Sequence, residues 1–482
     1  MRGLCRVAFV ILAGVLAYVA FQWGGVVRTG RYKSLLVLGV LAMVFSVARP
    51  RDRSSLDPGR VLRWTSVLLP AYVLFQAIPL PVAVLRPLSP ARAEMVDALG
   101  PIGAKTGFAS LSVSPGETFQ YFLLVCGYLI IFLLMCELTW RFEDGRWVAV
   151  WPVIAIATLE AGLGLWQYFG GIGEQDRWGT YANHNHYAGL LEMALPFAVI
   201  YPVTVLRGAR SWWRSPLTRS LAACGLWVLA GMMFAGIVHS LSRLGFIAAL
   251  SSLFVIGILA LVPRRLSWTT GCRRRQWVTA GFFVGLVLAS FVFLPPDRLV
   301  QRFAELVSTD GLNSGGRTPL WVETIPLIRA YPFFGCGLGG YETAFSRFKV
   351  SGVLETDDFA HNDYLQLLAE LGVVGFLIIG ALALSVVRMA VRGAVTSSDP
   401  QARYFAVACA GALAAILLHS LADFNLYIPA NAMLLAWIAG MTAGNRVQAS
   451  RTSAWGRLGH RKVLTAEAAE VGARIKRIAD AL

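Results

Sequence analysis

Residues 119–136 read FQYFLLVCGYLIIFLLMC, a stretch of eighteen residues without a charged side chain. A helix needs about 20 predominantly apolar residues to cross the roughly 30 Å hydrocarbon core of a bilayer. In lipid, the backbone N–H and C=O groups of such a stretch must be paired within the segment, which favours a helix. The stretch is therefore predicted to be a membrane-spanning helix, and similar apolar runs recur on both sides of it.

The composition of the whole chain is that of a membrane protein. Of its 482 residues, 56% are hydrophobic and 15% are charged, whereas soluble domains carry about 25% charged residues. We therefore predict an all-α polytopic integral membrane protein with about twelve transmembrane helices. The first run follows Arg2 and Arg6 as in a signal peptide, but no A-x-A site follows it, so we expect it to be retained. The spans are expected at residues 4–21, 34–48, 65–82, 119–136, 147–168, 187–206, 220–238, 243–262, 277–294, 365–387, 404–420 and 425–441.

The formal charge of +16 at pH 7 raises the question of a nucleic-acid partner. The basic residues, however, concentrate in alternate loops between the predicted spans and in the tail after Gly444. An excess of Lys and Arg marks the cytoplasmic loops of membrane proteins. Both termini are therefore predicted to be cytoplasmic, with membrane lipid and no nucleic acid as partner. The basic loops are residues 49–64, 137–146, 207–219, 263–276 and 388–403.

This topology divides the chain into five parts. They are transmembrane helices 1–4 (residues 1–150), helices 5–9 (151–294), a large outward loop (295–364), helices 10–12 (365–441) and a basic cytoplasmic tail (442–482). The large loop is too long for a simple connection, and two apolar stripes at helical spacing predict that it forms a helical extracytoplasmic cap. The stripes are Leu299, Phe303, Leu306 and Val307, and Tyr341, Phe345 and Phe348. To the outer loop from Leu85 to Thr118 the sequence assigns no role.

Arg317 is a candidate anion-binding residue of the large loop. Thr318 and Pro319, which follow it, predict the N-cap and the first residue of a helix. A helix N-terminus offers free N–H groups and the positive end of the dipole, and a guanidinium adds a charged fork, so phosphate is the expected ligand. The run from Gly335 to Gly340 is interpreted as a flexible turn, because no strand precedes it as a nucleotide-binding loop requires.

The large loop ends in His361-Asn362-Asp363-Tyr364 at the expected water–membrane boundary. An unperturbed histidine titrates near 6.5, so His361 is a candidate general base, with interfacial anchoring as the alternative. A divalent cation is a further alternative, although solvated loop carboxylates would give the same pattern and no D-x-D or H-E-x-x-H spacing is present. The possible ligands would be Glu355, Asp357, Asp358, His361 and Asp363.

Polar residues also gather in two other outward loops and in the spans. The loops read Arg177-Trp-Gly-Thr-Tyr-Ala-Asn183-His184-Asn185-His186 and His239-Ser-Leu-Ser242-Arg243. Ionisable residues are costly in lipid, so those in the spans either line a site or hold helices together. For Glu160 and Glu192 the structural role is favoured. The others are Glu370, His419 and Asp423.

Taken in order, these motifs resemble the O-antigen ligase and O-antigen polymerase superfamily of bacterial envelope enzymes. The resemblance covers roughly residues 150–440 and consists of an Arg-x-Gly…Asn-His loop, a Ser-Arg at the head of a span, an Arg-x-x-x-Trp, a Gly-x-Gly turn and a His-Asn-x-Tyr-Leu followed by Glu-x-Gly. It implies a bundle of the polyprenyl-phosphate glycosyltransferase type with a lipid groove and a periplasmic cap. It also implies that Arg243, Arg317 and His361 are the functional residues and face one cavity, without metal, nucleotide sugar, ATP or another cofactor.

The expected function is transfer of a glycan from a polyprenyl-diphosphate carrier to a sugar hydroxyl at the periplasmic face of the bacterial inner membrane. Arg243 and Arg317, with Arg177 as a third contact, would hold the diphosphate, and His361 would deprotonate the acceptor. The remaining candidate substrate-binding residues are Asn183, Asn185, Asn362 and Tyr364. The acceptor is a second lipid-linked glycan, lipid A-core or a protein hydroxyl. The alternative from another class is a secondary transporter or flippase-like protein, for which related halves and midplane polar sites would be expected.

Overall fold

The computed structural model describes most of the chain between Arg2 and Asn445. The described ranges are 2–48, 59–99, 106–142, 146–170, 178–207, 215–261, 307–308, 311–312, 317–351 and 357–445. Some predicted features lie outside them: the span at 277–294, the basic tail beyond residue 445, Arg177, Glu355, and Leu299, Phe303 and Leu306 of the cap.

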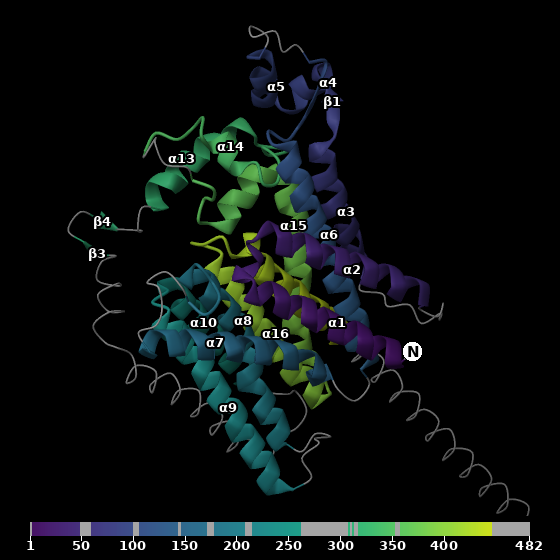
Figure 1. The fold of residues 1–482 in the computed structure, drawn as a ribbon, viewed down its shortest axis with the longest axis vertical. Coiled ribbons are helices and arrows are strands. Elements are labelled where there is room, and N and C mark those ends of the chain that lie inside the picture. Colours follow the sequence, from purple (N-terminus) through teal and green to yellow (C-terminus); the bar gives the residue numbers. More distant parts are fainter. Residues whose placement is uncertain are drawn as a thin grey trace, which may run out of the picture.

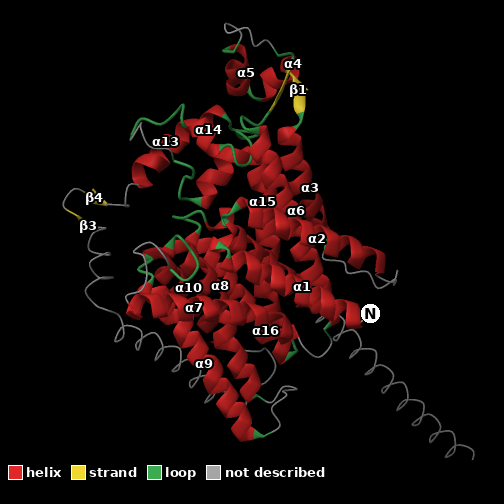
Figure 2. Cartoon of the chain, viewed as in Figure 1, coloured by secondary structure: helices red, strands yellow, loops and turns green. Residues whose placement is uncertain are grey.

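The described residues form an all-α polytopic membrane protein, as predicted (Figures 1 and 2). The long helices are α1 (Arg2–Phe21), α2 (Arg28–Ala48), α3 (Arg60–Ala77), α6 (Pro115–Arg141), α7 (Trp151–Gly170), α8 (His184–Leu206), α9 (Pro216–His239), α10 (Arg243–Leu261), α13 (Arg317–Ala330), α15 (Asp363–Thr396) and α16 (Pro400–His419), followed by a helix over 429–445. Short helices are α4 (Val82–Leu88), α5 (Pro90–Asp97), α14 (Tyr341–Phe345), η1 (Trp23–Gly25), η3 (Arg146–Val150) and η4 (Asn425–Tyr427). Two antiparallel pairs, β1 (Pro79–Pro81) with β2 (Phe108–Ser110) and β3 (Val307–Ser308) with β4 (Gly311–Leu312), are the named strands of these ranges.

Nine helices of the described ranges are long and apolar enough to cross a membrane, and each coincides with a predicted span. The predicted span at 65–82 is helical only as far as Ala77, because Pro79 and Pro81, which cannot donate a helical hydrogen bond, lie in β1. The predicted span at 425–441 consists of η4 and the helix over 429–445. Val307, predicted to be helical, lies instead in a strand.

α8 and α16 form the centre of the bundle (Figure 1). In the most apolar stretch of each helix, 89% of the residues of α8 and 83% of those of α16 are buried. α16 can pack closely because its apolar face consists largely of Ala and Gly: a Cβ on Gly411 would lie only 2.8 Å from Ile256 of α10. Small residues of this kind let helix backbones approach each other in lipid, where helices associate by packing rather than by the hydrophobic effect.

α15 is broken at Gly372, where the backbone has φ 60° and ψ −173°. The break frees carbonyl groups that must find other partners in an apolar surrounding. The turn after α13 supplies two of them: Cys336 N donates to Ala369 O and Gly337 N to Glu370 O, each at 2.9 Å. This turn was predicted to be flexible, but a Cβ on Gly335 would lie 2.2 Å from Glu370 O. The glycines therefore serve close packing rather than flexibility.

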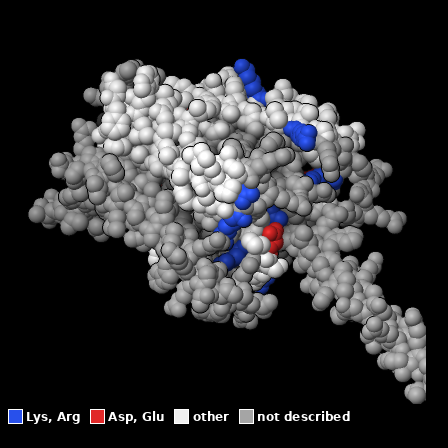
Figure 3. Space-filling model, turned by 90° about the horizontal axis from the view of Figure 1, so that it is seen from below, with Lys and Arg blue, Asp and Glu red and all other residues white. Residues whose placement is uncertain are grey.

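The cap covers one end of the bundle (Figure 1). α13 and α14 enclose a small core of their own, which includes Leu327, Tyr341 and Phe345. The lobe formed by β1, α4, α5 and β2 overlaps the loop from Leu85 to Thr118, to which the sequence assigned no role, and contacts this cap. Tyr331 Oη lies 3.1 Å from Met95 Sδ, and Val113 N donates to Cys336 O at 2.9 Å. Seen from below, the opposite end shows basic side chains as its main visible charged groups (Figure 3).

Replacing Gly372 by alanine should destabilise the protein. Its backbone angles are accessible almost exclusively to glycine, and strain of this kind costs about 1 to 3 kcal/mol. In addition, the new Cβ would lie 2.3 Å from Phe333 O. We expect a clearly lower thermal midpoint in detergent for Gly372→Ala. Gly257→Ala on α10 is the matched control, because nothing lies within 4 Å of its Cβ position. Equal midpoints for the two variants would contradict the packing described here.

Candidate functional site

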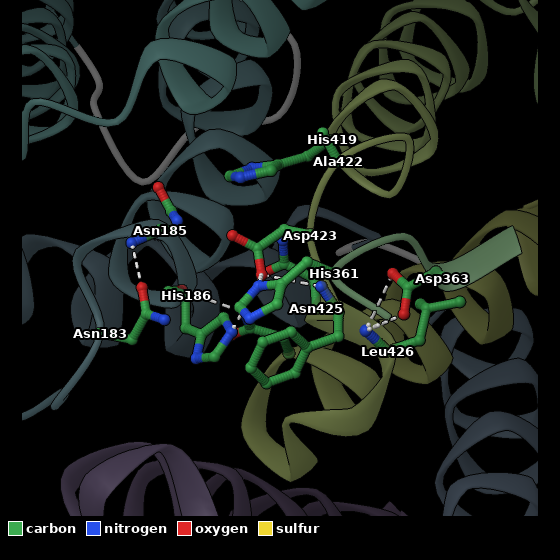
Figure 4. Close-up of polar contacts among 12 residues, drawn as sticks. Asn183, Asn185, His186, His361, Asp363, His419, Ala422, Asp423, Asn425 and Leu426 are labelled. Atoms are coloured by element: carbon green, nitrogen blue, oxygen red, sulfur yellow. Dashed lines mark hydrogen bonds and ion pairs between the residues drawn. The ribbon is translucent and has the colours of Figure 1, made fainter. Parts of the chain in front are cut away.

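The buried carboxylate of Asp423, in the loop after α16, lies close to three basic side chains, and Figure 4 shows two of them, His186 and His361. Oδ1 lies 3.3 Å from His186 Nε2 and 4.0 Å from His361 Nδ1. Oδ2 lies 3.7 Å from an Nη atom of Arg317. The structure thus brings together Arg317 and His361, two of the predicted functional residues, around a carboxylate that the prediction had not assigned to the site.

Asp423 is fixed by the way its loop wraps around the start of α15. Asp363 N donates to the carbonyl oxygens of Ser420 and Asp423, both at 3.0 Å. In return, the Asp363 carboxylate accepts from Leu426 N at 3.3 Å from each oxygen. Phe424 N donates to Asp423 Oδ1 at 2.8 Å. The position of the carboxylate is therefore determined by backbone hydrogen bonds on both sides of it.

His361 is held in an unusual backbone conformation, with φ at +47°. Such a conformation costs free energy in a residue other than glycine and persists only where the surroundings impose it. Asn362 imposes it from one side as the N-cap of α15, accepting from Tyr364 N and Leu365 N. On the other side, Ala360 N donates to the side chain of Gln366 at 2.7 Å. In this backbone conformation the half-buried imidazole faces Asp423.

Phe424 packs against both histidines. Its ring meets the edge of His186 at a centroid distance of 4.5 Å and the edge of His361 at 4.8 Å, both with an interplanar angle of 76°. Phe359 also stacks on it, with the ring centroids 4.1 Å apart. Edge-to-face contacts of this kind are favourable for aromatic rings. They keep both imidazoles beside the same carboxylate.

The charges of the site act on one another. Burial lowers the pKa of His361 below its usual value; Asp423 partly offsets this, while Arg317 and His186 lower it further. His361 is therefore neutral at pH 7 and able to accept a proton. Burial alone would raise the pKa of Asp423, but the hydrogen bond and charge of His186, with His419 and Arg317, hold it well below its usual range.

Arg317 begins α13, two residues before the predicted first helical residue, so Thr318 is not the N-cap that the sequence predicted. Its guanidinium donates to Ala422 O as well as facing Asp423. One turn later, Trp321 Nε1 donates to Ala360 O at 2.9 Å. The Arg-x-x-x-Trp motif therefore connects α13 to the loop after α16 and to the residue before His361. The Arg317 side chain remains 25% exposed, which leaves part of the guanidinium accessible to a ligand.

α8 and α10 begin beside this cluster. Asn183 caps α8 by accepting from Asn185 N at 2.8 Å, and His186 follows in the first turn. Arg243 is the first residue of α10, whose first turn packs on that of α8: a Cβ on Gly245 would lie 2.7 Å from Ala188 Cβ.

Several predicted residues have structural partners. Tyr364 Oη donates to Leu417 O at 2.6 Å, while Asn183 and Asn362 cap helices. Of the residues suggested for a metal, Asp357 pairs with Lys349 at 2.6 Å. Within the described ranges, no group of three or more His, Cys, Asp or Glu side chains is arranged to hold a metal ion.

Sequence reasoning missed His186 and Asp423 as partners of His361. Both stood in the sequence as polar residues near span ends, but 237 positions separate them, and no local pattern links them. A second buried pair joins α8 to the end of α16, where His419 Nδ1 is 2.9 Å from Glu192 Oε2 and both side chains are fully buried. Glu160 likewise accepts from Thr180 N and Oγ1 at 2.9 and 2.6 Å.

An apolar cavity of about 320 Å³ lies beside the site, between α3, α6, α15, α16 and the helix over 429–445. Its walls include Leu69, Phe132, Ile379, Leu413 and Ala436. Tyr364 and Ser420, which belong to the segments around Asp423, also line it. A cavity of this kind accepts hydrocarbon rather than a polar ligand.

Residues 228–380 match the family model for O-antigen ligase. The matched segment contains Arg243, Arg317 and His361 and is shorter than the 150–440 over which the motifs resemble the superfamily. The match confirms the resemblance to the O-antigen ligase and polymerase superfamily and supports a general role in O-antigen ligation or polymerisation. No curated protein matches the chain.

Removing one member of the Glu192–His419 pair should destabilise the bundle more than removing both. A buried charge that loses its partner costs about 3 to 5 kcal/mol, whereas replacing a buried pair by apolar residues of similar volume is often neutral. We expect His419→Leu to lower the thermal midpoint in detergent and the double variant Glu192→Leu with His419→Leu to recover most of the loss. Additive losses would show that the two side chains do not act as a pair.

Proposed function

Because residues 228–380 match the O-antigen ligase family, we propose that this protein transfers a glycan from a polyprenyl-diphosphate carrier to a sugar hydroxyl. The observation that carries the proposal is the arrangement around Asp423: a guanidinium and a neutral imidazole lie within 4 Å of one buried carboxylate, and an apolar cavity begins beside them. The guanidinium suits the diphosphate, the imidazole suits the acceptor hydroxyl, and the cavity suits the hydrocarbon of the carrier.

The diphosphate would be held by Arg317 and Arg243. Each is the first residue of its helix, and α8 and α15 also begin next to them, so several helix N-termini contribute positive potential. Asp423 holds the Arg317 guanidinium in place without covering it fully. Arg177, which lies outside the described residues, would be a third contact. Fixed donors of this kind stabilise charge as it develops on a leaving group.

The carrier's hydrocarbon would lie in the apolar cavity. Tyr364 and Ser420 line it; Tyr364 Oη donates to Leu417 O near the end of α16, and Ser420, three residues before Asp423, accepts from Asp363 N. A lipid whose headgroup meets Arg317 therefore has an apolar path between α15 and α16. The sugar rings would be contacted by Asn183, Asn185, Asn362 and Tyr364. These contacts would use the polar atoms that are not already engaged in helix capping or in hydrogen bonds to the backbone.

In the proposed reaction, His361 takes the proton of the acceptor hydroxyl as that oxygen attacks the anomeric carbon. A new glycosidic bond forms, the bond to the diphosphate breaks, and the bonding electrons leave with the polyprenyl diphosphate, whose charge the arginines stabilise. Direct displacement inverts the anomeric configuration. The ionised Asp423 then stabilises the imidazolium, as a carboxylate beside a catalytic histidine does. No metal or cofactor takes part in this mechanism.

The proposed location is the bacterial inner membrane, with both termini in the cytoplasm and the site facing the periplasm. The concentration of Lys and Arg in alternate loops of the sequence supports this orientation. The acceptor would be a second lipid-linked glycan, which makes the protein a polymerase, or lipid A-core, which makes it a ligase. A protein hydroxyl is the third possible acceptor. We favour the polymerase, because no feature of the sequence suggests a domain dedicated to a protein acceptor.

Variants of the two central residues test the mechanism. Removing one donor from a charge-stabilising site costs about 2.7 to 4 kcal/mol, so Arg317→Ala should lower kcat by about 10²- to 10³-fold. His361→Gln should lower it by about 10²- to 10⁴-fold, the usual contribution of general-base catalysis. The assay follows transfer from a lipid-linked glycan by purified protein in liposomes.

Arg347→Ala is the matched control for these variants. Arg347 is also a cap arginine, but its side chain is 53% exposed and pairs with Glu94 at 3.6 Å. Its activity should equal that of the wild type. Full activity of Arg317→Ala would exclude the diphosphate contact, and full activity of His361→Gln at every pH would exclude the general base.

The pH dependence of kcat/KM provides a test that depends on charge alone. A base must be deprotonated, and the pKa of His361 is lowered, so activity should rise with pH and level off at a lower pH than an unperturbed histidine would give. Asp423 favours the imidazolium and Arg317 opposes it. The acidic limb should therefore move to lower pH in Asp423→Asn and to higher pH in Arg317→Gln. If the acidic limb moved in the same direction in both variants, the electrostatic account would be contradicted.

A further inference from the structure

The break in α15 leaves a short helical segment, residues 363–371, between His361 and Gly372. At a rise of 1.5 Å per residue this segment is about 13 Å long. Its first end is attached to the loop around Asp423 through Asp363 N. Its last end lies where the chain leaves helical geometry, so this end must be held by groups from elsewhere in the protein.

Two side chains of α3 hold that end. Tyr72 Oη lies 2.6 Å from Leu371 O and 3.1 Å from Phe334 O. Gln76 Nε2 donates to Glu370 O at 2.8 Å and to Phe334 O at 2.7 Å. Each side chain therefore joins the end of segment 363–371 to the glycine turn after α13, residues 334–340.

The carboxylate of Glu370 connects the same end of the segment to the glycine turn, to α14 and to Tyr427. It accepts from Gly339 N at 2.9 Å, Tyr341 N at 3.2 Å and Tyr427 Oη at 2.7 Å. Gln76 contributes here too, because its Oε1 accepts from Leu338 N at 3.2 Å. Tyr427 lies four residues beyond Asp423, so α3, the glycine turn, the end of the short segment and the Asp423 loop form one connected set.

α3 also touches the apolar cavity. Ser66, Leu69 and Pro70 line it, and Tyr72 and Gln76 follow within two turns. One helix therefore forms part of the cavity wall and part of the junction at Gly372. α3 lies outside the matched segment 228–380, and nothing in its sequence pattern had indicated a part in the reaction.

From these contacts we infer that Tyr72 and Gln76 are positioning residues: they hold segment 363–371 so that His361 keeps its place beside Asp423. The inference rests on the proposed transferase function. A displacement of about 1 Å in a catalytic group can cost about 100-fold in rate. Loss of the junction should therefore lower turnover, while the cavity wall, one turn away, should govern binding of the carrier.

The test compares three variants that differ in where they act. Tyr72→Phe keeps the ring, which packs against Gly375, and removes only the hydroxyl. We expect kcat to fall by about 10- to 100-fold, with KM for the lipid-linked donor within twofold of the wild type. Leu69→Ala, in the cavity wall, should raise that KM several-fold and leave kcat within twofold. Tyr404→Phe removes a tyrosine hydroxyl at the other end of the bundle and should change neither value.

Hydrogen exchange distinguishes positioning from general destabilisation. In Tyr72→Phe, amides of 334–341 and 363–372 should exchange faster, while those of α8 and α16 keep their wild-type rates. Gln76→Leu should reproduce both the exchange pattern and the loss of kcat, and the two substitutions together should cost less than the sum of their separate effects.

The outcomes separate this inference from the proposed function. If the wild type is active and Tyr72→Phe and Gln76→Leu keep its kcat, the positioning role is wrong. Faster exchange throughout the bundle would equally overturn it, because the hydroxyl would then serve overall stability. Absence of transfer by the wild type with every acceptor would refute the transferase itself, whatever the exchange pattern of the variants.

Discussion

Burying the charge of Asp423 is the constraint on which the site depends. A carboxylate taken out of water must be paired and hydrogen-bonded, or it becomes neutral. Here the partners come from three separate parts of the chain: His186 from α8, Arg317 from α13 and His361 from the segment before α15. Pairing one charge thus brings the cap and two transmembrane helices to a single point. The same charge keeps the Arg317 guanidinium in a fixed orientation.

The second requirement is to satisfy the backbone of α15 where it breaks. Because of the break, a short helix of residues 363–371 follows His361 at the edge of the bundle. The break also exposes carbonyl groups that lipid cannot satisfy. The glycine turn after α13 and the side chains of α3 supply the missing donors. Close backbone approach, rather than flexibility, therefore explains the positive φ angles of Gly335, Gly337 and Gly339. The cap is built onto the bundle through this junction.

The sequence contained enough information to predict the fold class and two members of the cluster. Length and composition of the apolar runs predicted the helices, because a spanning segment must satisfy its own backbone. Chemical type and motif order pointed to Arg317 and His361. Asp423 and His186 could not be paired in advance, since their contact depends on how α8 and α16 pack. The same holds for Tyr72 and Gln76, whose partners lie more than 250 positions away.

Errors at the level of single elements have local causes. Prolines 79 and 81 end the third helix earlier than its hydropathy suggested. The spacing of apolar residues predicted a helix through Val307, although two-residue pairing with β4 is what forms there. The predicted roles of Asn183, Asn362 and Tyr364 must share their side chains with helix capping and with a backbone carbonyl. Their part in binding substrate stays a prediction.

The most direct measurement is the fate of a defined donor. Purified protein in liposomes would be incubated with polyprenyl-diphosphate-linked repeat units, first alone and then with lipid A-core, while released polyprenyl diphosphate and glycan length are followed. The account predicts release of the diphosphate lipid together with longer lipid-linked glycans, or with glycan on lipid A-core. A donor that stays intact with both acceptors, in the presence of folded protein, would contradict it.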